Sequence, residues 1–179
     1  MTFGTACNGS VEKDANTLLV NAVEEENFSK IKALVKGGAD PNRHVPKIGS
    51  AMSNATLCST PKCLELLIDL GGNPNLYRET TKRNIIFKVI SPNKIEFVKL
   101  LVDRGADINV KDGVGNTPLM TAITLEQFDI ALYLIEKGAN KELKNNFGND
   151  ALKIYESLRV DKTLTSDSFE FKVKQELMK

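Results

Sequence analysis

The pattern of apolar and polar positions along residues 112–140 predicts two consecutive helices. Thr117 suits an N-cap, and Pro118 suits the first helical position, where its missing N–H group costs no hydrogen bond. Apolar residues then recur at helical spacing along a short segment and, after a break, along a longer one. The two stripes comprise Leu119, Ala122 and Ile123, and then Phe128, Ile130, Ala131, Leu134 and Ile135. Gly138 is placed to end the second helix, because glycine adopts the left-handed conformation without strain.

A short glycine-containing phrase recurs along the chain, at residues 37–42, 71–75, 105–109 and 138–142. The glycines in register, Gly38, Gly71, Gly105 and Gly138, are separated by 33, 34 and 33 residues. Such a period indicates an array of helix–turn–helix units, each packed on its neighbours because neither helix buries its stripe alone. We therefore predict a single domain over residues 1–179. Its repeats are expected at about 12–44, 45–78, 79–111 and 112–144, with a degenerate capping repeat at 145–179.

The fourth of these units resembles the ankyrin repeat. The resemblance is carried by Thr117-Pro118-Leu119, Ala122, the run from Ile130 to Leu134, and Gly138-Ala139. It implies an all-α repeat solenoid with short β-hairpins. The copies lack the histidine usual after Thr-Pro-Leu in this family, and its place is taken by Val20, Ser53, Phe87, Met120 and Lys153. Since that histidine normally ties one repeat to the next, we expect reduced cooperativity, with the second repeat the least stable.

Both ends of the array are expected to be capped. The first repeat is rich in polar residues around a sparse apolar set, as a terminal repeat should be. Near the other end, Asp167 and Glu170 have the spacing of a capping box. Phe169, Val173 and Leu177 follow at helical intervals and predict a final helix that closes the stack. We interpret the chain as a complete small protein.

Composition excludes several classes of protein. The chain has 24 basic and 23 acidic residues and a net charge of +1, so it offers no electrostatic basis for binding nucleic acid. No secretory signal and no stretch long enough to span a membrane are visible. Three scattered cysteines favour reduced thiols. We therefore expect a cytoplasmic protein, or one delivered into a host cell without a classical signal peptide.

Candidate catalytic and metal sites are weak. His44 is the single histidine and falls in a predicted exposed loop, with no cysteine near it in the sequence. One histidine and three cysteines do not have the spacing of a zinc site, and Gly113 and Gly115 belong to a turn rather than a phosphate-binding loop. Asp103 and Asp107 are expected to be solvated. We predict no catalytic residue, no metal and no cofactor.

The resemblance to ankyrin repeats implies that a partner protein binds the concave side, formed by the hairpin tips and the exposed parts of the first helices. Tyr77, Arg83 and Phe147 are the preferred anchors, because aromatic residues and arginine dominate binding energy at interfaces. The remaining candidates carried over from the family are Lys47, Leu57, Val114, Asn116, Leu125, Glu24 and Glu25. The alternative is that Leu57 and Leu125 tuck between repeats and that Phe147 packs on the preceding hairpin.

The predicted function is therefore non-catalytic binding of another protein, as an adaptor or as an inhibitor of the immunity type. Two alternatives remain open: a pathogen or viral effector that engages host proteins, and a module that assembles with itself. We expect a monomer, with no contact to nucleic acid or membrane.

Overall fold

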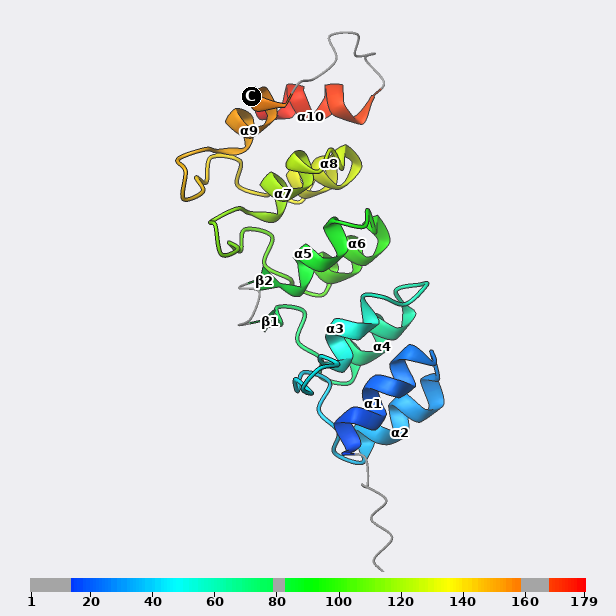
Figure 1. Ribbon diagram of the computed structural model, residues 1–179. Helices are drawn as coiled ribbons and strands as arrows, with labels where there is room; N and C mark the ends of the chain where they lie inside the picture. Colours follow the sequence, from blue (N-terminus) through cyan, green and yellow to red (C-terminus); the bar gives the residue numbers. More distant parts are fainter. Residues whose placement is uncertain (1–13, 79–82, 159–167) are drawn as a thin grey trace, which may run out of the picture.

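The computed structural model describes residues 14–78, 83–158 and 168–179, which form a stack of helix pairs with loops projecting to one side (Figure 1). The first helix of each pair, called the inner helix, adjoins these loops: α1 (Ala15–Glu24), α3 (Ala51–Ala55), α5 (Ile85–Ile90), α7 (Pro118–Thr124) and α9 (Ala151–Ser157). The second, or outer, helices are α2 (Phe28–Lys36), α4 (Lys62–Asp69), α6 (Ile95–Asp103), α8 (Phe128–Glu136) and α10 (Phe169–Leu177). The predicted all-α repeat solenoid is confirmed.

Helix α7 begins and packs as its sequence predicts. The Thr117 hydroxyl accepts a hydrogen bond from the backbone N–H of Met120 at 3.3 Å, and Pro118 occupies the first turn. Met120 fills the place of the missing histidine with a fully buried side chain, and its sulfur lies 3.4 Å from the Thr117 nitrogen. Gly138 ends α8 with a φ of 87°, the left-handed conformation expected of it.

The final helix differs from its prediction in two respects. Ser168, not Asp167, is the N-cap of α10, and its hydroxyl accepts from the backbone N–H of Phe171 at 3.1 Å. Asp167 lies outside the described residues. Val173 and Leu177 are buried as predicted, but Phe169 is exposed, with the Lys172 ammonium 5.8 Å from its ring centre.

A ladder of asparagine side chains joins successive repeats. Asn42, Asn75 and Asn109 each accept a hydrogen bond from a backbone N–H of the following repeat, at 2.7–2.8 Å. Asn42 and Asn75 also donate to the carbonyl groups of Gly71 and Gly105. These contacts satisfy backbone groups just after the outer helices and fix the register of the stack.

The junction between the second and third repeats is built differently from its neighbours. Helices α3 and α5 approach each other less closely than α1 and α3 or α5 and α7 do. Three cations of the third repeat reach back across this junction. Lys88 donates to Ser53, Lys94 donates to the carbonyls of Thr56 and Cys58, and Arg104 pairs with Glu65 and Asp69. Polar contacts thus replace part of the apolar packing.

Candidate functional site

Four loops, which we call fingers, project from the same side of the stack (Figure 1). The first (45–49) is closed by a bridge between Val45 and Gly49, with both N–H···O distances 2.9 Å. The second contains the antiparallel strands β1 (Tyr77–Arg78) and β2 (Arg83–Asn84). The third (112–116) and fourth (145–149) are closed by backbone hydrogen bonds of 2.9 Å between their end residues. Short, internally bonded loops of this kind present their side chains in fixed positions.

The third and fourth fingers share one internal construction and are joined to each other. Asp112 accepts the backbone N–H groups of Val114 and Asn116, and Asn145 does the same for Phe147 and Asn149, all at 2.9–3.0 Å. The side-chain amide of Asn145 also donates to the Asn116 side-chain oxygen at 2.8 Å. Asn116, a candidate for partner binding, therefore links two fingers.

Large apolar side chains are exposed on three successive fingers. Tyr77 is 44% exposed, Val114 is 43% exposed and Phe147 is 74% exposed. Phe147 is therefore not packed against the preceding finger, which excludes that alternative for it. Lys47 is also exposed, at the tip of the first finger, with a φ of 70°. Exposed apolar side chains on a rigid support are typical of a surface that binds another protein.

Four other candidates lie away from the fingers. Glu24 and Glu25 end α1 and begin the turn to α2, while Leu57 and Leu125 lie in the corresponding turns after α3 and α7. The inner helices separate these turns from the fingers by about 10 Å, at 1.5 Å per residue. Glu25 pairs with Lys30 at 3.1 Å. Leu57 and Leu125 are exposed, so neither is enclosed between repeats.

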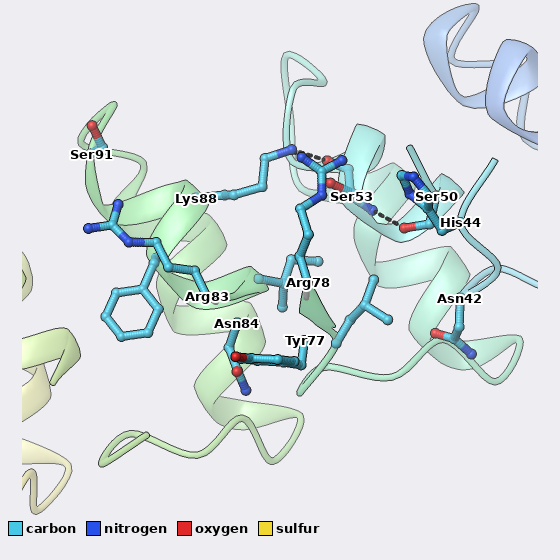
Figure 2. A pocket seen from close by; sticks show the side chains of 13 residues that line it. Asn42, His44, Ser50, Ser53, Tyr77, Arg78, Arg83, Asn84, Lys88 and Ser91 are labelled. Atoms are coloured by element: carbon cyan, nitrogen blue, oxygen red, sulfur yellow. Dashed lines mark hydrogen bonds between the residues drawn. The ribbon is translucent and has the colours of Figure 1, made fainter. Parts of the chain in front are cut away.

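Tyr77 and Arg83 are brought together with residues that sequence reasoning did not select. They line a cavity of about 700 Å³ along the second finger, between α3 and α5 (Figure 2). Its wall also includes His44, Arg78, Phe87 and Lys88, and the hydroxyl groups of Ser50, Ser53 and Ser91. The cavity therefore occupies the junction at which the inner helices pack least against each other.

Lys88 is one of the residues of this cavity that the sequence analysis missed. Its ammonium lies 2.9 Å from the Ser53 carbonyl and 2.8 Å from the Ser53 hydroxyl (Figure 2). Burial lowers the pKa of Lys88, and the charges of Arg78 and Lys94 lower it further. The signal for it was present in the sequence: a lysine stands within the otherwise apolar run Ile85-Ile-Phe-Lys-Val-Ile90. A charged side chain at that place loses hydration, which costs free energy unless polar partners compensate for it.

Arg83 is held on the opposite side of the cavity. Its guanidinium forms a 3.1 Å ion pair with Asp112, whose side chain is 1% exposed, and lies 5.8 Å from the ring centre of Phe87. The Arg83 side chain itself remains 48% exposed. Asp112 therefore organises the third finger and fixes an arginine of the second.

The two described cysteines and the histidine have different surroundings. Cys58 and Cys63 are buried, and burial, followed by the contact with Cys63, raises the pKa of the Cys58 thiol to about 12. His44 is exposed at the cavity edge. Within residues 14–78, 83–158 and 168–179, no group of three or more His, Cys, Asp or Glu is arranged to hold a metal ion. In the same segments, no helix is long and apolar enough to cross a membrane.

Comparison with known proteins identifies a matching family and several relatives. Residues 51–145 match the family described as ankyrin repeats, in three copies. An ankyrin repeat protein of Fowlpox virus (strain NVSL) is 27% identical over 140 residues, covering 77% of this chain and 31% of the viral protein. An ankyrin repeat protein of Acanthamoeba polyphaga mimivirus is 33% identical over 102 residues, covering 54% of this chain and 62% of its own.

A third relative is human protein phosphatase 1 regulatory subunit 27. It is 48% identical over 61 residues, which is 34% of this chain and 39% of the human protein. The chain therefore spans between about a third and three-fifths of the length of these three relatives.

Proposed function

The chain belongs to the ankyrin repeat family, whose repeats are protein–protein interaction modules, and on that premise we propose that it binds a partner protein through its fingers and inner helices, without catalysis. The observation that carries the proposal is the row of exposed apolar side chains, Tyr77, Val114 and Phe147, on three successive fingers. Internal hydrogen bonds hold two of these fingers rigid before any partner arrives, which reduces the entropy lost on binding.

The role we assign is that of an adaptor or inhibitor acting in the cytoplasm. The human relative is named as a regulatory subunit, and a protein that regulates by binding is of the same class. A second role, an effector that engages host proteins, is favoured by the two viral relatives. The two roles predict different partners: one from the organism that makes the protein, and one from its host.

Affinity capture from lysates of both cells tests the proposal. The test variant combines Tyr77→Ala, Arg83→Gln and Phe147→Ala; glutamine is chosen because a glutamate would face the buried Asp112 carboxylate. A control variant, Lys36→Gln with Phe169→Ala, removes a charge and an exposed aromatic ring from the outer helices. Each variant is first matched to the wild type by thermal unfolding.

The expected result is a partner captured by the wild type and the control but not by the test variant. Its origin then decides between the two roles. A partner retained by the folded test variant and lost by the control would place binding on the outer helices and would refute the proposed surface.

A further inference from the structure

The cavity between the second and third repeats has an excess of positive charge. Arg78, Arg83 and Lys88 line it, and its described lining residues include no aspartate or glutamate. Asp112 forms an ion pair with Arg83 and offsets one of these charges. Its side chain is almost completely buried and is not among the lining residues. Because the whole chain has a net charge of +1, the local excess reflects placement rather than composition.

Two of these cations are held in position with hydrogen-bonding capacity to spare. An ammonium has three donors, and Ser53 accepts two from Lys88. A guanidinium has five donors, and Arg83 uses one of them on Asp112. Both groups are thus oriented in advance, so a ligand that accepts their remaining N–H groups loses little entropy in ordering them.

The surroundings of Lys88 disfavour its positive charge in the absence of a ligand. The pKa of Lys88 is lowered by burial and by neighbouring positive charges, which means that its charged form is disfavoured where it stands. A negative group entering the cavity would reverse this and stabilise the charged lysine.

Apolar side chains form the rest of the wall. Leu76, Tyr77, Ile85 and Phe87 line the cavity beside the cations; Tyr77 is exposed and Leu76 partly so, whereas Ile85 and Phe87 are almost fully buried. A small inorganic anion would satisfy the charges and leave this surface uncovered. A nucleic acid would require cations spaced along a phosphate backbone, whereas these are gathered in one cavity. A peptide carrying an acidic side chain next to a large apolar one fits both parts.

We propose that this cavity binds an acidic segment of the partner protein, with carboxylates of that segment at Lys88 and at Arg83 and an adjacent apolar side chain against Tyr77. The inference rests on the proposed function and deepens it by assigning the chemistry of the partner. It makes Lys88 a residue that determines specificity.

Selection from a phage-displayed library of random linear peptides on immobilised wild-type protein provides the test. The enriched peptides are expected to share an aspartate or glutamate beside a large apolar residue. In fluorescence anisotropy, Lys88→Gln and Arg83→Gln should each weaken binding of the best peptide roughly 10- to 100-fold. Lys144→Gln, which removes an exposed charge outside the cavity, should leave the affinity unchanged. Arg83 is the more exposed of the two, so its variant remains informative if Lys88→Gln fails to fold.

Other outcomes overturn the inference in distinguishable ways. If the enriched peptides are neutral or basic and Phe147→Ala abolishes their binding, the acidic site is refuted, whereas the finger surface is still supported. Acidic peptides that bind both cavity variants like the wild type would place the site elsewhere. Inorganic phosphate or an oligonucleotide that displaces the peptide and binds more tightly would replace the peptide with a phosphate ligand. If no peptide is enriched and the variant with Tyr77→Ala, Arg83→Gln and Phe147→Ala captures the partner like the wild type, the proposed function is refuted as well.

Discussion

Gly72→Ala should destabilise the protein, although it makes the second repeat more like the others. The corresponding residues in the other repeats are Ala39, Ala106 and Ala139. At position 72, however, a Cβ atom would lie 2.4 Å from the Met52 sulfur and 2.7 Å from the Leu67 carbonyl oxygen. The methionine side chain can move aside, but the carbonyl belongs to the backbone of α4.

The magnitude follows from two opposing effects. Adding a methyl group to a packed site costs about 1–3 kcal/mol. Restricting the unfolded chain by replacing glycine with alanine returns about 0.4–1 kcal/mol. Taking the middle of each range, the expected net loss is about 1.3 kcal/mol, which lowers Tm by about 3–5 °C in a protein of this size.

Gly37→Ala is the matched control. The equivalent positions hold Leu70, Arg104 and Lys137, and Gly37 has a φ of −78°, which any residue adopts. A Cβ atom at this position would lie 3.3 Å from the Ala33 and Leu34 carbonyl oxygens, which offsets part of the entropic gain, so the control should stay within about 1 kcal/mol of the wild type. Urea unfolding followed by circular dichroism gives both values if the slopes agree. A Gly72→Ala protein as stable as the wild type, beside a control that behaves as stated, would refute the packing argument.

The remaining predictions concern the ladder, the thiols, the cavity and assembly. Asn75→Ala should cost about 1–2 kcal/mol in urea unfolding and more than Asn109→Ala, because Asn75 joins the next repeat by two hydrogen bonds and Asn109 by one. In a Cys7→Ser background, Cys58 and Cys63 should not react with Ellman's reagent until the protein unfolds, because both thiols are buried. The stability contributed by the Cys58 thiol should be present below its ordinary pKa of 9.0 and fall as pH rises toward 12, since the unfolded thiol ionises first; comparing urea unfolding with Cys58→Ala at several pH values checks this. Lys88→Met should stay within about 1 kcal/mol of wild-type stability while losing acidic peptides, and a larger loss would mean that the bond to Ser53 holds the junction. Light scattering at two concentrations should give one monomer mass, and a mass that rises with concentration would favour self-assembly.

The parts of the structure that were predictable from sequence depend on local patterns. Thr117, Pro118 and Gly138 act on backbone groups within a few residues, so their roles follow from spacing alone. The roles of Lys88 and Asn116 depend on partners in another repeat, 35 and 29 residues away. Nothing in the local pattern distinguishes an asparagine that faces a partner protein from one that bonds to the next finger. Repeat spacing therefore predicts where the fingers lie, whereas the use of each side chain depends on contacts with other repeats.

The junction between the second and third repeats departs from regular stacking in several ways, and one physical argument connects them. The single 34-residue interval adds its extra residue between Gly71 and Asn84, the part of the chain that contains the second finger. There the inner helices lie further apart, and Lys88 and Lys94 span the gap with hydrogen bonds to the preceding repeat. Apolar side chains would have closed this gap and stabilised the stack, because partly buried charges lose hydration that their contacts only partly restore. The two lysines instead leave a cavity at this junction, the one that we propose as the peptide site. Such a replacement of apolar packing is expected where a fold departs from its own repeat in order to bind something.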